Sequence, residues 1–279
     1  MTPSAIYEGT ALSAVLAAEG GEDSGFQSPT IEEFYPEPLF SFSVAGIDFE
    51  FTRITLILIF ATTAILVLLV AAVRKPSIVP GKLQYLGESG YSLVRDGIAR
   101  DVVGPKGLPF APFLASLFFY ILANNAMSVV PGLQISPMSK FAYPLVLAVI
   151  TWVVYNWVGI REQGAGRYFK DAAVPPGVPI GALILVTPIE LLQVFVIRPF
   201  TLAVRLFANM FAGHMLLAVF SLGTVYLLTV GNFSVIFSPF AFLMALIMTF
   251  FEVLVIVLQA YVFTVLTATY INGAVEPAH

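Results

Sequence analysis

Five strongly polar side chains stand inside two long apolar segments near the end of the chain and could carry proton chemistry. They are Arg205, Asn209 and His214 in the first segment, and Glu252 and Gln259 in the second. A carboxylate and an imidazole can bind and release protons near neutral pH, whereas an arginine side chain stays protonated in proteins. Placing an arginine at the centre of a bilayer costs between about 3 and 17 kcal/mol, depending on how the cost is measured. An arginine kept at that cost predicts a functional site.

The positions of these residues match when the two segments are folded back on each other at Asn232. Arg205 lies 27 residues before this turn, and Gln259 lies 27 residues after it. His214 lies 18 residues before the turn, and Glu252 lies 20 residues after it. We therefore expect Arg205 to lie at the depth of Gln259, and His214 at the depth of Glu252.

An acid, an arginine and a histidine follow one another along the first segment. Glu190 precedes Arg205 by fifteen residues and His214 follows it by nine, so the three span about 36 Å of helix at 1.5 Å per residue. Asn209 shares the face of Arg205, and His214 points about 180° away from that face. Two titratable groups on either side of one that cannot titrate predict two proton routes with a gap, which a carboxylate on a moving partner could bridge.

The composition places these residues in a membrane protein. The chain has 279 residues, of which 58% are hydrophobic and 11% are charged, whereas soluble domains are about a quarter charged. Continuous apolar runs of about 20 residues are typical of spanning helices and not of the alternating strands of a barrel. We expect an all-α polytopic membrane protein. The absence of cysteine excludes disulfides and thiolate metal sites, and nothing in the sequence indicates a cofactor, a metal or a nucleic-acid partner.

Five membrane-embedded helices and one surface helix are expected, with no internal repeat. The last two spans are much longer than the others, and a glycine- and proline-rich linker precedes them. The expected spans are 51–73, 109–131, 141–160, 179–229 and 234–271, the surface helix is 82–103, and tails cover 1–50 and 273–279.

The surface helix is expected from its spacing of apolar residues. The segment is too charged to span, but apolar residues recur at three- and four-residue intervals, which indicates an amphipathic helix lying on the membrane. A helix packed on a soluble partner is the alternative. The apolar residues are Leu83, Leu86, Val94, Ile98 and Val102.

The length of the last two segments constrains their arrangement. Fifty-one and thirty-eight helical residues would measure about 76 Å and about 57 Å, whereas the hydrocarbon core is about 30 Å thick. We expect two long, strongly tilted, antiparallel helices. A break at Pro188 or Pro199, which would make two spans of the first segment, is the alternative.

The basic residues predict the orientation in the membrane. Loop 74–106 carries six Lys or Arg residues and loop 161–177 carries three, so both loops are expected on the cytoplasmic side. The N-terminus is then extracytoplasmic and the C-terminus cytoplasmic. The first 50 residues hold nine of the seventeen acidic residues and no Lys or Arg, which indicates an acidic, mostly flexible tail. A faint signal-peptide cleavage site, SAVLAAEGG, is the alternative.

At this point the chain resembles a known family. RPFTLAVRLFANMFAGH, followed by FEVLVIVLQAYVFTVLTATYI, closely resembles subunit a of the F-type ATP synthase. The resemblance covers roughly 34–272, with PLFSF before the first span and NN in the second. It implies a stator subunit in a bacterial plasma membrane, with two offset half-channels and two long tilted helices facing a ring of c subunits.

The resemblance also implies roles and partners. Arg205 matches the family's essential arginine, which separates the half-channels and engages a ring carboxylate. Asn209, His214, Glu252 and Gln259 match polar positions near it and in the outer half-channel, while Glu190 resembles an inner acid and Asn124 a polar position of the second span. The implied partners are the c-ring, a b-type peripheral stalk, lipid and, indirectly, the soluble sector that carries the nucleotide chemistry, which this chain is not expected to perform.

Two other classes of function are less consistent with the sequence. A proton-coupled secondary transporter would also bury arginine, glutamate and histidine, but it should show internal repeats and broken helices. A purely structural subunit would not need charged residues at matched depths.

Overall fold

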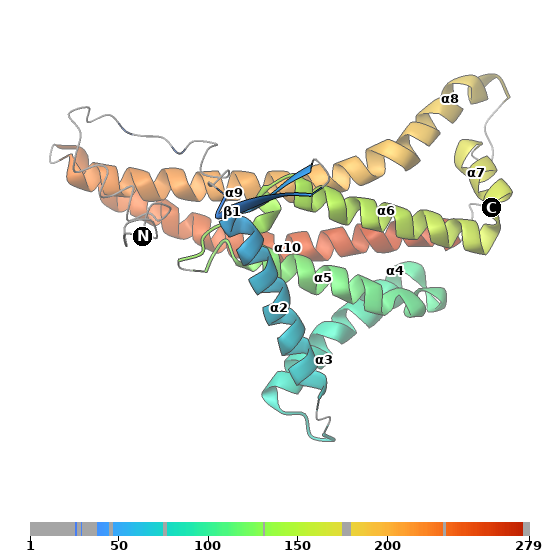
Figure 1. Cartoon of the computed structure of the whole chain (residues 1–279), viewed down its shortest axis with the longest axis horizontal. Coiled ribbons are helices and arrows are strands. Elements are labelled where there is room, and N and C mark those ends of the chain that lie inside the picture. The colour runs from blue at the N-terminus through green and yellow to red at the C-terminus, as the bar shows by residue number, and fades with distance from the viewer. Residues whose placement is uncertain are drawn as a thin grey trace. The chain divides into compact units, whose positions relative to one another are not determined.

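Long helices dominate the computed structural model of the chain (Figure 1). The chain divides into two compact units. Unit 1 comprises 1–60, 124–139 and 209–256, and unit 2 comprises 61–123, 140–208 and 257–279. The structure describes residues 26, 29, 38–44, 47–74, 77–130, 132–174, 180–230 and 233–275. Most of the predicted acidic tail, the predicted turn at Asn232 and residues 276–279 of the C-terminal tail lie outside the described residues.

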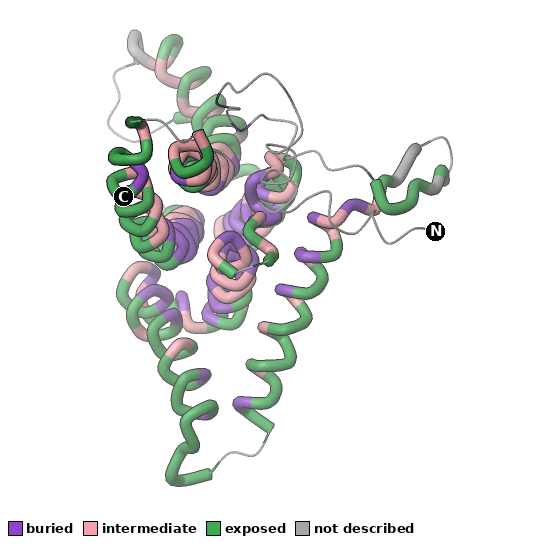
Figure 2. Tube along the Cα trace, turned by 90° about the vertical axis from the view of Figure 1, so that its left-hand side faces the viewer, coloured by how far each residue is buried: buried purple, intermediate pink, exposed green. Residues whose placement is uncertain are grey.

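Five helical segments of the described chain are long and apolar enough to cross a membrane, as the sequence predicted. Leucine, isoleucine, valine and phenylalanine side chains are exposed along them, and buried residues form stripes on the helices (Figure 2). An apolar surface of this extent requires lipid or a partner. The chain is therefore an all-α, multi-pass membrane protein. The segments are Arg53–Val73, Pro105–Ala126, Ala142–Gln163, Leu183–Thr229 and Phe233–Val275.

A short β-hairpin precedes the first span in unit 1. Strand β1 (Phe40–Val44) pairs antiparallel with β2 (Ile47–Phe51), so that Phe40 lies opposite Phe51. The two rings stack with centroids 4.7 Å apart. The alternation in FSFSV and IDFEF is a strand signal, which the expectation of a mostly flexible tail overlooked.

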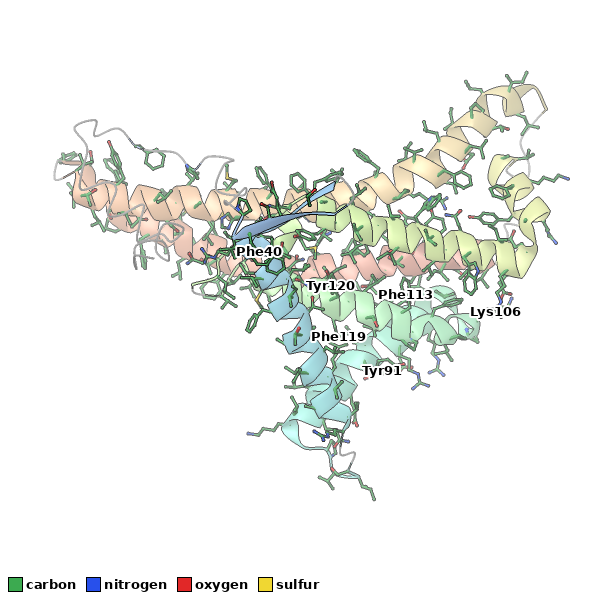
Figure 3. The ribbon with its side chains drawn as sticks, viewed as in Figure 1. Phe40, Tyr91, Lys106, Phe113, Phe119 and Tyr120 are labelled. Atoms are coloured by element: carbon green, nitrogen blue, oxygen red, sulfur yellow. The ribbon has the colours of Figure 1, made fainter. Side chains whose placement is uncertain are left out.

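The first span is helix α2 (Arg53–Val73), and α3 (Lys82–Val94) follows it. In unit 2, α3 approaches α2 and α5 (Ala111–Ala126) through glycines. A Cβ on Gly87 would lie 2.8 Å from Cβ of Ala72, and a Cβ on Gly90 would lie 2.8 Å from Cζ of Phe119. Phe119 is labelled where α5 runs close to α3 in Figure 3. The absence of side chains at these two glycines therefore allows the close approach.

The two halves of the predicted surface helix differ in burial. Leu83 and Leu86 are exposed, whereas Gln84 and Gly87 are buried. The Gln84 amide donates to the Ser77 carbonyl at 3.2 Å, which satisfies its burial. Helix α3 continues as a π-turn η3 (Arg95–Arg100) and α4 (Asp101–Val103), where the predicted Val94 and Ile98 are buried. Gln84 and Gly87 make the first contacts within the protein, and Leu83 and Leu86 stay available to lipid, so the placement of this helix on the membrane stays a prediction.

The second span begins earlier and ends earlier than expected. It starts with the 3-10 helix η4 (Pro105–Phe110), continues as α5 and ends at Ala126. Turns then begin, in which the amide of Ser128 donates to the carbonyl of Asn125 at 3.1 Å. A 3-10 helix η5 (Pro137–Ser139) closes the loop before α6 (Ala142–Gln163).

A helix occupies part of the expected linker. Helix α7 (Ala165–Ala173) turns back from α6 at Gly164, whose φ of 81° favours glycine. The Tyr168 hydroxyl donates to Oδ1 of Asn156 at 2.9 Å. Burial raises the pKa of Tyr168, while Arg198 opposes this effect. The side chain therefore stays a neutral hydrogen-bond donor and fixes α7 to α6.

The fourth segment bends without breaking. Helix α8 (Ile180–Leu192) passes through the π-turn η6 (Gln193–Ile197) into α9 (Arg198–Thr229), and α8 leaves the direction of α9 in Figure 1. Neither Pro188 nor Pro199 ends the helix, so the alternative of two separate spans is not observed. A π-turn is a known cause of a helix bend.

The last two helices run antiparallel. After η7 (Phe233–Phe237), α10 (Ser238–Val275) has 38 residues and measures about 57 Å. In unit 1, Ser238 donates to the Thr224 carbonyl at 3.4 Å. In unit 2, the Arg198 guanidinium lies 5.3 Å from the ring centroid of Tyr270, and Gln163 Nε2 donates to the Ala274 carbonyl at 2.7 Å.

The contact between α6 and α7 yields a stability prediction. A Cβ on Gly159 would collide with the ring of Tyr168, so Gly159→Ala should lower the free energy of unfolding by about 1–3 kcal/mol. Gly166→Ala, on α7 with nothing within 4 Å of its Cβ, is the control and should change stability by about 1 kcal/mol or less in either direction. Thermal unfolding of the detergent-solubilised protein measures both. Equal melting temperatures for the two variants would contradict the contact.

Candidate functional site

Unit 1 holds a deeply buried carboxylate on α10. Glu252 is 3% exposed, and a Cβ on Gly213 of α9 would lie 3.9 Å from its Cδ and Oε1 atoms. Gly213 directly precedes His214, which is half-buried. The structure therefore brings Glu252 to the turn of α9 that carries His214, which is the placement expected from their positions in the sequence. The absence of a side chain at Gly213 leaves room for the carboxyl group.

A neutral polar side chain, Ser128, lies near this carboxylate, and two others are linked to Ser128. The Ser128 hydroxyl approaches Glu252, but its hydrogen bond is donated to the Asn125 carbonyl at 2.9 Å. Ser136 in turn donates to Oδ1 of Asn125 at 3.3 Å. Asn125, Ser128 and Ser136 are all buried. Both carboxyl oxygens of Glu252 are thus buried without a hydrogen bond from the described residues, which is a costly state for a charged group.

Backbone contacts hold the loop that supplies these polar groups. The Arg53 guanidinium donates to the Gly132 carbonyl at 2.8 Å, and the Ser139 hydroxyl donates to the Ser136 carbonyl at 2.6 Å. Gly132 has φ of 88° and Gln134 has φ of 47°. Because Gly132 adopts a backbone conformation that favours glycine, the loop has a defined shape and its polar residues have defined positions.

Asn124 and Asn209 complete the predicted polar residues of unit 1. Asn124 is fully buried on α5. Asn209 is exposed on α9, with exposed Ala208 before it in unit 2 and exposed Ala212 after it. This part of α9 presents small side chains beside an amide, which would let another helix approach closely.

Unit 2 holds the arginine on the outer face of α9. Arg205 is exposed, whereas Leu202, Ala203 and Leu206 on the same helix are buried. The described residues place no carboxylate within salt-bridge distance of its guanidinium. The cation is therefore exposed on a face of α9 that also exposes Thr201, one turn before it, and the apolar Phe200.

Gln259 and Glu190 are the other predicted residues of unit 2. Gln259 lies on the buried face of α10, beside Ala260 and Phe263. Glu190 is half-buried on α8, three residues before the π-turn. The predicted equal depth of Arg205 and Gln259 stays a prediction.

A known protein family matches most of this chain. The family model described as ATP synthase A chain matches residues 54–272. The chain belongs to the ATP synthase A chain family. It is thus a subunit of ATP synthase, and it works within that complex.

Individual ATP synthase relatives align along most of the chain. ATP synthase subunit a of Parafrankia sp. is 46% identical over 91% of this chain and 86% of its own length. The subunit a of Frankia alni is 43% identical over 90% of this chain and 87% of its own length. The subunit a of Streptomyces lividans is 38% identical over 98% of this chain and 99% of its own length.

Sequence reasoning missed the neutral polar residues of the ATP synthase subunit. Ser128, Asn125 and Ser136 carry no charge, and a serine near the end of an apolar segment is most often a packing or turn residue. The paired asparagines inside the second span were the available signal, because two adjacent amides are unusual in lipid-buried helix. Their burial and hydrogen bonds, which only the fold gives, connect them to Glu252.

The close approach of α9 and α10 can be tested by cross-linking, since the chain has no native cysteine. Gly213→Cys combined with Glu252→Cys should form a disulfide under mild oxidation, because the two side chains face each other. Gly213→Cys combined with Leu254→Cys is the control, since Leu254 is exposed. Loss of labelling by a polyethylene-glycol maleimide measures disulfide formation. Equal cross-linking of both pairs would show that the register of the helices is different.

Proposed function

We propose that the chain is the proton-conducting stator subunit of its ATP synthase, with two half-channels that load and unload carboxylates on a ring of c subunits. The observation that carries this proposal is Arg205. A permanent cation is exposed on an apolar helix, with no carboxylate of the described chain within salt-bridge distance. A cation in lipid needs a counter-charge, so the carboxylate is expected on a partner.

Arg205 acts as the barrier between the two routes. Its guanidinium cannot give up a proton, so it cannot pass one from one side of the membrane to the other. It attracts a deprotonated ring carboxylate and releases it once that group is protonated and neutral. The neutral carboxyl group can then rotate into the lipid, which a charged carboxylate would enter only at a high cost in free energy. Gln259 on α10 and Asn209 on α9 offer amides that orient the arginine and the ring carboxylate.

The polar cluster of unit 1 forms the outer half-channel in this proposal. Protons enter from the extracytoplasmic side along the loop that follows α5, in which Ser128 and Ser136 are buried. Glu252 binds the proton, because its buried carboxyl group accepts no hydrogen bond from the described chain. His214, on the turn of α9 beside it, shares this proton and hands it to the ring. Asn124 belongs to the same polar lining.

Glu190 of α8 marks the inner half-channel. It is half-buried, so it reaches both protein and solvent and can take a proton released by the ring toward the cytoplasm. Each charge crossing 100 mV releases about 2.3 kcal/mol. Several protons must therefore be accumulated by rotation for each ATP made. The nucleotide chemistry takes place in the soluble sector, to which a b-type peripheral stalk fixes this subunit, and this chain performs none of it.

The proposed topology places the subunit in a bacterial plasma membrane, with its N-terminus outside and its C-terminus in the cytoplasm. The basic loops support this orientation. The unbroken helical path from α8 into α9 also supports a stator over a secondary transporter, since transporters bind their substrates at discontinuous helices.

Replacing the arginine tests the barrier. In liposomes containing the whole ATP synthase, Arg205→Ala should abolish ATP synthesis driven by an imposed proton gradient and should raise passive proton permeability, because nothing then separates the two routes. Arg100→Ala is the control, since Arg100 is exposed on η3. ATP yield and the fluorescence of a pH-sensitive dye are measured. Normal synthesis by Arg205→Ala would refute the role.

Exchanging two side chains tests the shared proton position. Glu252 lies against the turn that carries His214, so His214→Glu combined with Glu252→His keeps both groups in one place. The exchanged protein should retain at least about tenfold more ATP-driven proton pumping than either His214→Ala or Glu252→Ala, since general acid–base groups contribute at least this factor. If the exchange is as inactive as the two alanine variants, the two residues do not share a proton.

A further inference from the structure

The π-turn η6 between α8 and α9 is held by a side chain from a distant helix. The Tyr155 hydroxyl of α6 donates to the carbonyl of Val194 at 2.7 Å. Tyr155 is 1% exposed and Val194 is also buried. This bond joins residues 39 positions apart in the sequence. A π-turn is rare and is found frequently at functional sites.

The backbone of this turn explains why the tyrosine is needed. The amide of Arg198 donates to the carbonyl of Gln193, five residues earlier. The carbonyl of Val194 would, in the same register, accept from the amide of residue 199. That residue is Pro199, which has no N–H. A buried carbonyl without a donor is unfavourable, and the Tyr155 hydroxyl supplies the missing donor.

Aromatic contacts hold the same turn from other directions within unit 2. The ring of Phe195 meets the ring of Trp152 edge-on, with centroids 6.2 Å apart. On α7, Phe169 stacks on Phe195 with centroids 6.0 Å apart and an interplanar angle of 17°. Helices α6 and α7 thus fix both the backbone and a side chain of η6.

The turn lies between two residues of the proposed proton path. Glu190 precedes η6 on α8, and Arg205 follows it on α9. A turn closed by five-residue hydrogen bonds is wider than an α-turn. The register of η6 therefore fixes the direction in which Glu190 points relative to Arg205.

We propose that Tyr155 is a positioning residue that, together with Pro199, selects the π register and so sets the facing of Glu190 relative to Arg205. The inference rests on the proposed function, because it assigns a purpose to that relative orientation. Tyr155 itself relays no proton in this scheme. It acts through the Val194 carbonyl.

The test measures the rotation of α8 about its own axis relative to the start of α9. Single cysteines at 183–189 and 201–204 are spin-labelled in the complete ATP synthase in liposomes, and the collision of each label with oxygen is recorded. Accessibility to oxygen, which concentrates in lipid, rises and falls with the helical period. With Tyr155→Phe, the pattern over 183–189 should shift by about one residue relative to that over 201–204. The loss of the donor should shift the equilibrium away from the π register by at least about fivefold, the smallest effect expected when a buried acceptor loses its donor, and proton pumping should fall with it.

Matched variants separate the hydrogen bond from packing. Tyr155→4-aminophenylalanine retains a donor and should keep the wild-type pattern and activity, whereas Tyr155→4-methylphenylalanine has similar size without a donor and should behave like Tyr155→Phe. This pair also decides the question if Tyr155→Phe does not assemble. Tyr85→Phe, at an exposed tyrosine of α3, should change nothing.

The outcomes distinguish this inference from the function on which it rests. An unchanged accessibility pattern in both donor-free variants overturns the positioning role, even if Arg205→Ala abolishes coupling as expected. A shifted pattern with normal pumping also overturns it, because the orientation would then not matter. Normal coupling in Arg205→Ala overturns the proposed function instead, whatever the pattern of α8.

Discussion

Apolar surroundings require every polar group of this protein to have a partner. Two charged residues on its longest helices find none within the described chain. Glu252 is buried without a hydrogen bond from the described chain, and Arg205 is exposed on α9 without a carboxylate of the described chain in reach. The first group is neutralised most simply by a proton. The second needs an anion from outside. A buried acid and an exposed cation that lack partners in the described chain are consistent with a subunit that works in a larger complex.

The same requirement explains the neutral polar residues around the carboxylate. Asn125, Ser128 and Ser136 bond to one another and to the backbone, so these side chains can stay buried without water at each group. The bond from Arg53 to the Gly132 carbonyl ties that loop to the start of the first span. The positions of these polar residues therefore depend in part on Arg53, which is distant from Glu252 in the sequence.

Features set by composition and local spacing could be predicted from the sequence, and features set by contacts between distant segments could not. The spans follow from the length of the apolar runs, and the polar residues of the site stand out because lipid makes them costly. The register of His214 and Glu252 follows from counting residues. By contrast, the contact of α3 with α2 runs through Gly87 and Ala72, which the spacing of the leucines does not reveal. The π-turn depends on Tyr155, which no pattern around Pro199 reveals.

A contact at the last turn of α10 can form only late in the synthesis of the subunit. Gln163 at the end of α6 donates to the carbonyl of Ala274, and 111 residues separate the two. Synthesis runs from the N-terminus, so α6 is inserted in the membrane long before its acceptor exists. The bond can close only after Ala274 has been made. The end of α6 is therefore fixed to α10 late in synthesis, and a chain cut before Ala274 lacks this contact.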